Sequence, residues 1–194
     1  MAGHARYTAL LDACVLYPLA LSDALMSLAV TGMFAGKWTT QIEHEWISNL
    51  AAQRPDLIDR LPRRRDLMRQ TVHDWEVTQA AWQALAPSLT LPDANDVHVL
   101  AAAAIAGHAD CIVTTNLKDF PAATVGLFGI EVIHPDDFII KQLDLDPITA
   151  LAAFREMRAR WQRPDATPTA FAQAMERNGL VATAERLRQA ISLL

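Results

Sequence analysis

The sequence predicts an α/β fold with a central parallel sheet and a helical C-terminal appendage. Two observations support this prediction. Short apolar segments typical of buried strands alternate with segments of helical periodicity over residues 1–143. Residues 144–194 instead contain two arginine-rich amphipathic segments, at about 148–162 and 168–192. We therefore predict an α/β domain at 1–143, a linker at 144–147 and a helical appendage that completes the chain.

Composition is consistent with this division. Of 194 residues, 52% are hydrophobic and 20% are charged, which excludes a largely disordered chain. Cys14 and Cys111 lie in apolar runs without metal-type spacing, so we expect core residues of a reduced, cytoplasmic protein. Pro18 and Asp23 interrupt the apolar stretch 13–36, which therefore indicates a buried helix rather than a membrane span.

The first half of the chain contains one acidic residue at the end of a strand. In chain order we predict a strand at 7–11, an apolar helix at 22–34 ended by Gly36, a helix at 40–53, helical segments at 56–86 with a bend or a boundary at Pro62, and a strand at 88–91. Asp12 follows the first strand, where it needs a cation, hydrogen bonds or a raised pKa, unless it caps the next helix. Thr40 to Glu43 match a capping box, which explains Glu43 structurally.

A second acidic unit follows at residues 91–120. Asp93 stands at an N-cap position and Asp96 in the first turn of an apolar helix, for which Gly107 supplies a stop. A buried strand at 111–114 comes next, and Asp119 lies in the polar loop beyond it. Sites in open α/β sheets lie outside the carboxyl ends of the strands, so these acidic residues are expected to converge. A last strand at 130–133 and a helix from 135 complete the domain.

Four carboxylates thus come from four separate elements: Asp12, Glu45, Asp96 and Asp119. Glu45 lies one turn into the helix at 40–53, and a solvent-facing role is its simpler explanation. Converging carboxylates repel one another unless a cation compensates them, and oxygen ligands favour Mg²⁺ or Mn²⁺ over zinc. Such ions activate water and stabilise charge on a leaving oxygen. The sequence therefore predicts metal-dependent phosphodiester hydrolysis.

The segments that carry these residues resemble the four ordered motifs of the PIN domain, a family of metal-dependent ribonucleases that includes the VapC toxins of type II toxin–antitoxin systems. The segments are Leu10-Leu11-Asp12, Ile42-Glu43-His44-Glu45-Trp46, Asp93-Ala94-Asn95-Asp96 with Val97 to Ala103, and Ile112-Val113-Thr114-Thr115-Asn116-Leu117-Lys118-Asp119-Phe120. The resemblance spans about residues 7–140. It implies a three-layer α/β/α fold with a central parallel sheet.

The resemblance also implies roles for individual residues. Asp12 and Asp96 would be the principal metal ligands, Glu45 would bind the metal or orient its water, Asp119 would complete the acidic site, Thr114 and Asn116 would support it, and Asp93 would be an outer ligand or only a cap. The appendage resembles the helical tail of a VapC subgroup, which could pack on the domain, support a homodimer or guide RNA.

The distribution of charge does not decide which surface, if any, binds RNA. The net charge is −5, but residues 147–194 carry seven arginines against four acidic residues. A second cluster comprises Arg54, Arg60, Arg63, Arg64, Arg65 and Arg69. Either cluster is equally explained by a solvated helix face and by contact with RNA phosphates.

The expected function is an endoribonuclease of single-stranded RNA, with a small antitoxin protein as partner and no membrane association. Three alternatives remain at this stage. One is a housekeeping RNA-processing nuclease with the same site, and another is a PIN-like scaffold without activity. The third is a phospho-acceptor signalling domain, in which one aspartate and Lys118 would be critical and Glu45 would not.

Overall fold

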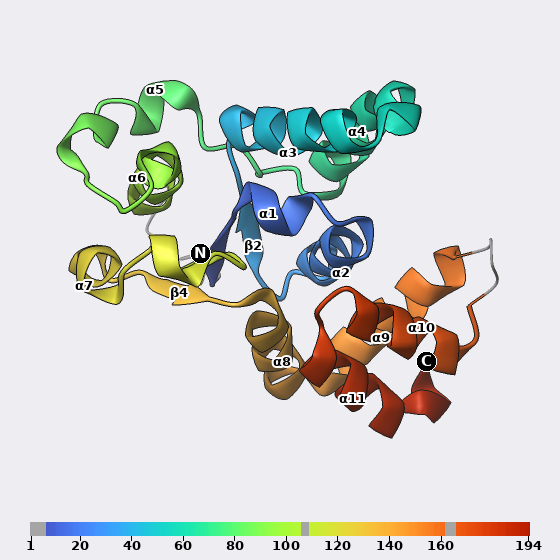
Figure 1. Cartoon of the computed structure of the whole chain (residues 1–194). Coiled ribbons are helices and arrows are strands. Elements are labelled where there is room, and N and C mark those ends of the chain that lie inside the picture. Colours follow the sequence, from blue (N-terminus) through green and yellow to red (C-terminus); the bar gives the residue numbers. More distant parts are fainter. Residues whose placement is uncertain (1–6, 106–108, 162–165) are drawn as a thin grey trace.

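Four short parallel strands form the centre of the protein. The computed structural model describes residues 7–105, 109–161 and 166–194. The strands are β1 (Thr8–Leu11), β2 (Ala35–Lys37), β3 (Cys111–Val113) and β4 (Glu131–Ile133), in the order β2-β1-β3-β4 (Figure 1). Three of them confirm the strands predicted at 7–11, 111–114 and 130–133. β2 was not predicted, and Gly36, expected to end a helix, lies within it.

The sheet order creates the edge at which the predicted site lies. The chain leaves β1 toward β2 on one side and later returns to pair β3 on the other side. Leu11 pairs with Val113, so the residues that follow β1 and β3 emerge next to each other. This is the topological switch point of an open α/β sheet, where the two neighbouring loops diverge and leave room for a site.

Helices cover both faces of the sheet. The α-helices of the described residues are α1 (Ala13–Leu16), α2 (Leu19–Val30), α3 (Thr40–Gln53), α4 (Leu61–Thr71), α5 (Gln79–Trp82), α6 (Val97–Ile105), α7 (Ala122–Val125), α8 (Pro135–Leu145), α9 (Pro147–Arg160), α10 (Pro168–Arg177) and α11 (Val181–Gln189). Figure 1 shows α6 on one side of the sheet and α2 with α8 on the other. The predicted three-layer α/β/α fold with helices added at the C-terminus is therefore confirmed.

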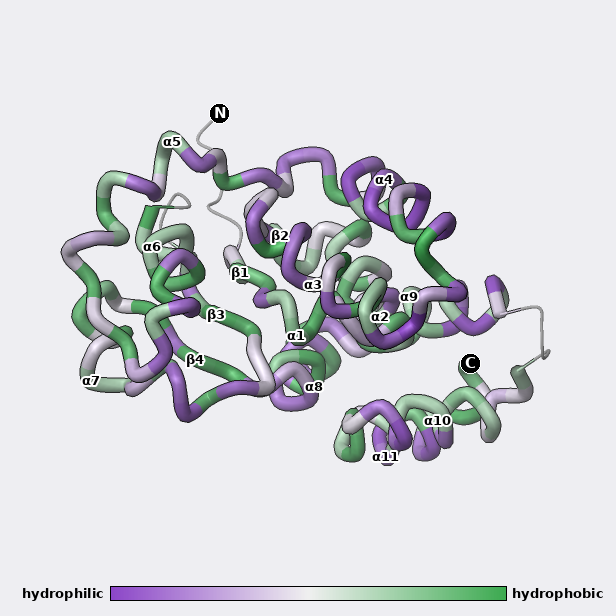
Figure 2. Tube along the Cα trace, turned by 45° about the horizontal axis from the view of Figure 1, so that its top comes forward, coloured by the Kyte–Doolittle hydropathy of each residue, from purple (hydrophilic) through white to green (hydrophobic). Residues whose placement is uncertain are grey.

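The core explains why the central strands read as uniformly apolar. Leu10, Leu11 and Ile112 are fully buried, because β1 and β3 are covered on both faces. In Figure 2, β3 is coloured as hydrophobic while α4 is mostly hydrophilic. Among the described residues, no helix combines the length and apolar character that a membrane crossing requires.

The predicted capping box at 40–43 is wrong. Thr39, not Thr40, caps α3, and its Oγ1 accepts a hydrogen bond from Ile42 N at 3.0 Å. The Glu43 side chain is buried, where it accepts a hydrogen bond from Trp38 Nε1 at 3.0 Å and pairs with Arg69. Its ion-pair partner comes from α4, which brings Arg69 beside the start of α3, and a local sequence pattern does not reveal this contact.

Several boundaries also differ from expectation. The apolar helix ends at Val30, and residues 72–78 leave the helical path, where Glu76 forms an isolated β-bridge with Trp38. At Pro62 the predicted boundary is confirmed, because this residue lies in the first turn of α4. No strand forms at 88–91, where the chain follows a 3₁₀ turn at Ala86–Ser88. Pro62 fits a helix start because its missing N–H is not needed there. The stop predicted at Gly107 lies outside the described residues.

The appendage is tied directly to the α/β domain. The predicted linker at 144–147 is wrong, because α8 runs to Leu145 and Asp146 caps α9 by accepting a hydrogen bond from Thr149 N at 3.0 Å. α9 packs on α2, where Arg160 pairs with Asp23 at 2.7 Å. The segment at 168–192 forms two helices, which part at Gly179 with φ +83°. Residues 162–165, within the predicted break, are outside the described ranges, and the division into domains at residue 144 stays a prediction.

Candidate active site

Asp12 lies at the switch point, where β1 passes into α1. Its backbone N–H donates to Val113 O at 3.2 Å, and Thr114 Oγ1 donates to its Oδ2 at 2.7 Å, which joins the ends of β1 and β3. Ala13 N donates to Oδ1 at 2.6 Å, so Asp12 is also the N-cap of α1. The Cys14 thiol donates to Oδ2 at 3.0 Å. The capping alternative is thus confirmed, and these donors compensate the buried carboxylate whether or not a cation binds.

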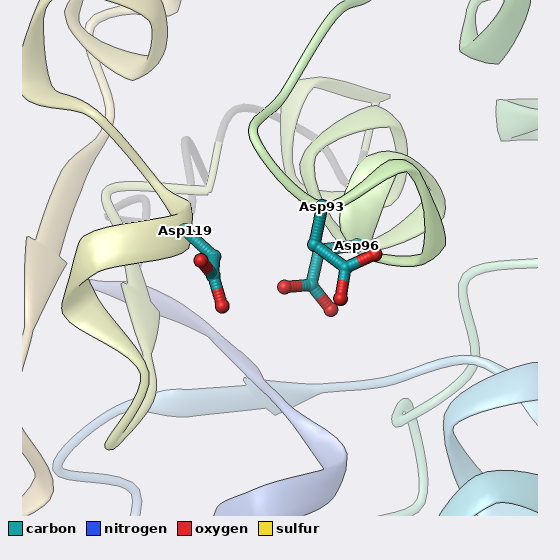
Figure 3. Close-up of side chains that lie close together, drawn as sticks. All are labelled: Asp93, Asp96 and Asp119. Atoms are coloured by element: carbon teal, nitrogen blue, oxygen red, sulfur yellow. The ribbon is translucent and has the colours of Figure 1, made fainter.

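Three other carboxylates gather at the same edge. Asp93, Asp96 and Asp119 each offer an oxygen within 4.8 Å of the other two. Figure 3 shows Asp93 and Asp96 together at the start of the α6 region and Asp119 facing them from the loop after β3. Asp93 Oδ1 accepts a hydrogen bond from Asn95 N at 2.9 Å, so this residue both caps the turn Ala94–Asp96 and belongs to the acidic group.

The electrostatics of this group centre on Asp96. Burial, followed by the charges of Asp12, Asp93 and Asp119, raises the pKa of Asp96 to about 6. Its Oδ2 is buried and has no hydrogen-bond partner among the described residues. A buried carboxylate oxygen without a donor is costly. A divalent cation among the three carboxylates would supply the missing partner, and the all-oxygen set fits Mg²⁺ or Mn²⁺.

The predicted supporting residues hold the loop that carries Asp119. Thr114 is fully buried, and its Oγ1 accepts a hydrogen bond from Asn116 N at 3.0 Å. The Asn116 amide in turn donates to Asp119 Oδ2. Thr114 therefore connects Asp12 to the loop, and Asn116 orients the carboxylate that faces Asp96.

Glu45 lies outside the group of three. On α3, its Oε1 lies 2.8 Å from His98 Nε2 and accepts a hydrogen bond from Gln41 Nε2 at 3.4 Å. In the sequence analysis, His98 was assigned no role at the site. Its position two residues after Asp96 was the available signal, but no pattern linked it to α3.

Cys14 was expected in the core, yet its thiol contacts two site residues. It donates to Asp12 and lies 3.2 Å from Thr114 Oγ1. Burial, followed by the charge of Asp12, raises the pKa of the Cys14 thiol to about 11. The thiol therefore stays protonated at neutral pH and remains a hydrogen-bond donor. Its place two residues after a strand-end aspartate was the signal that could have revealed this.

Four of the six clustered arginines have partners within the protein. Arg54 pairs with Asp56, Arg65 pairs with Asp66, Arg69 pairs with Glu43, and Arg64 donates to the carbonyl groups of Leu16 and Tyr17. Arg60 and Arg63 are exposed. With Arg54 and Arg64, they line a groove of about 720 Å³ between α2 and α4. The three clustered aspartates do not line this groove, so it is separate from the acidic site.

Comparison with known families and proteins adds three findings. The model of the PIN domain matches residues 8–118, and the model of the VapC50 C-terminal domain matches residues 135–189. A protein of Mycobacterium tuberculosis described as "Putative ribonuclease VapC50" is 41% identical over 81 residues. That match covers 42% of this chain and 47% of the relative, so the chain spans about half the length of the curated relative it matches. No solved structure matches.

Proposed function

Because the chain belongs to the PIN-domain family, we propose that it is a metal-dependent endoribonuclease of the VapC type, the toxin of a toxin–antitoxin pair. The observation that carries this proposal is the group of Asp93, Asp96 and Asp119, in which one buried oxygen has no hydrogen-bond partner among the described residues. The ribonuclease name of the relative supports the reaction class. The substrate is single-stranded RNA, cut to leave a 5′ phosphate and a 3′ hydroxyl.

The acidic residues hold Mg²⁺ or Mn²⁺ in this proposal. Asp96 is the central ligand, Asp119 approaches from the opposite loop, and Asp12 or Asp93 completes the set. When bound, such an ion lowers the pKa of a water nucleophile and stabilises charge on the phosphate. The ion would also offset the repulsion from Asp12, Asp93 and Asp119 that contributes to the raised pKa of Asp96.

The chain's own residues position the reacting groups. Thr114 holds Asp12 through the 2.7 Å hydrogen bond, and Asn116 holds Asp119. Glu45 orients the attacking water from α3. Arg60 and Arg63, which are exposed at the groove between α2 and α4, contact RNA phosphates. A small antitoxin protein would inhibit the enzyme by placing a side chain in the acidic site.

Cleavage assays test the proposal directly. Single-stranded and structured RNAs are incubated with the wild type or with Asp96→Asn in Mg²⁺, Mn²⁺ or EDTA. We expect cutting of single-stranded RNA that requires the metal and is lost in the variant, because the variant lacks the central ligand. Identical traces from the two proteins would point to a contaminating nuclease and refute the assignment.

A further inference from the structure

His98 makes a contact that the proposed chemistry does not yet use. It is the second residue of α6, two residues after Asp96, and its side chain is only 6% exposed. Nε2 lies 2.8 Å from Oε1 of Glu45, which belongs to α3. The two atoms are in close polar contact, although the contact does not have the geometry of a hydrogen bond. It joins the helix that follows Asp96 to the helix that carries Glu45.

The surroundings of His98 leave Glu45 as its polar partner. The ring packs in a tilted arrangement on Trp82, with the ring centroids 6.0 Å apart. Nδ1 is buried and has no hydrogen-bond partner among the described residues. If the ring served only for packing, its buried nitrogens would be a disadvantage, because their desolvation is unfavourable. The nitrogen that does meet a partner therefore points to a role at Glu45.

Glu45 needs such a partner. Its side chain is 33% exposed, and the hydrogen bond that it accepts from Gln41 is long at 3.4 Å. A glutamate in this setting loses rotamer freedom only if something holds it. Carboxylates at metal sites depend on outer partners for their orientation, and loss of such a partner typically costs about 10–100-fold in metal affinity or activity.

We propose that His98 is a positioning residue that holds Glu45 against the first turn of α6, next to Asp96. The contact fixes one carboxylate oxygen of Glu45, and the other oxygen is thereby kept in a limited range of directions. The inference rests on the proposed nuclease function for its effect on cleavage. Its effect on metal binding does not require that RNA be the substrate.

A double-mutant cycle distinguishes this role from simple packing. The four proteins are the wild type, His98→Ala, Glu45→Ala and the double variant, with His98→Gln as the conservative control because its amide nitrogen reaches a position similar to Nε2. Urea unfolding in EDTA establishes that each protein is folded. Mn²⁺ affinity is then measured by electron paramagnetic resonance, and kcat and KM are measured on a single-stranded RNA.

The expected results follow if His98 acts on the metal site through Glu45. His98→Ala should weaken Mn²⁺ binding or lower kcat by about 10–100-fold, with KM for RNA little changed, and His98→Gln should restore most of this loss. In the Glu45→Ala background, His98→Ala should have no further effect, because its target is already removed. Equal losses from His98→Ala in both backgrounds, or no loss in Mn²⁺ affinity and kcat, would overturn the inference.

Failure of the proposed function would look different. If the wild type cut no RNA beyond the level of Asp96→Asn, the nuclease assignment would fail. The Mn²⁺ cycle would still decide whether His98 acts through Glu45. If the wild type cut RNA and the cycle showed additive effects, only the positioning role would be lost.

Discussion

Replacing Asp96 with asparagine should stabilise the metal-free protein while removing its response to metal. The folded-state pKa of Asp96 is about 6, compared with an ordinary value of 3.8. At ~1.36 kcal/mol per pH unit this difference corresponds to about 3 kcal/mol of unfavourable free energy when the carboxylate is ionised. Because Asp96 is only partly buried, screening reduces the expected cost to about 1–2 kcal/mol. Loss of a negative charge near a helix N-terminus offsets ~0.3–1 kcal/mol.

The net gain of about 1 kcal/mol should raise Tm in EDTA at pH 7.5 by about 2–4 °C. The pH dependence has a definite sign. Since the folded state binds this proton more tightly than the unfolded state, the penalty is present above pH 6 and disappears as pH falls toward 3.8. The advantage of Asp96→Asn over the wild type should therefore be largest above pH 7 and vanish near pH 4.

Added Mn²⁺ should reverse the order of stability. A ligand at 100 times its Kd stabilises the folded state by about 2.7 kcal/mol, and the variant lacks the central carboxylate that would provide this gain. Differential scanning fluorimetry with and without Mn²⁺, from pH 4 to pH 8, measures both effects. A variant that is less stable than the wild type in EDTA at pH 7.5, or that gains as much from Mn²⁺, would refute the reasoning.

Three further predictions concern residues outside the group of three aspartates. Arg69→Ala should lower the free energy of unfolding, measured with urea, by about 2–4 kcal/mol, because it leaves buried Glu43 without its ion pair. Adding Glu43→Gln should recover part of this loss, and an Arg69→Ala variant as stable as the wild type would contradict the prediction. Arg63→Ala should leave stability unchanged and reduce the salt dependence of RNA binding by about one phosphate contact, as measured by fluorescence anisotropy, and an unchanged salt slope would argue against the contact. Thr114→Val removes the 2.7 Å hydrogen bond to Asp12 and should cost about 1.5–3 kcal/mol together with weaker Mn²⁺ binding; unchanged unfolding and titration curves would show that the bond is dispensable.

Most of the fold and part of the candidate site could be predicted from apolar strands and the polar residues that follow them. Buried strands of a parallel sheet are apolar throughout, so β1 and β3 are visible as local runs, and the polar residues that follow them must emerge at one edge. That geometry is why Asp12, Thr114 and Asp119 could be placed together before their contacts were known. β2 escaped notice because its three residues, Ala35 to Lys37, carry no periodic signal.

Other features depend on elements that are distant along the chain. The role of Glu43 is decided by Arg69, 26 residues later, and the contact of Glu45 is decided by His98 on another helix. A capping motif reports hydrogen bonds within one turn, whereas these partners meet only when α3 packs beside the segments that return to it. The sequence by itself therefore determined three of the four strands and the order of the acidic loops along the chain, because apolar strands and the polar residues that follow them are local patterns. Only the tertiary structure decided which carboxylates face one another and which arginines turn inward, since these depend on how the helices pack.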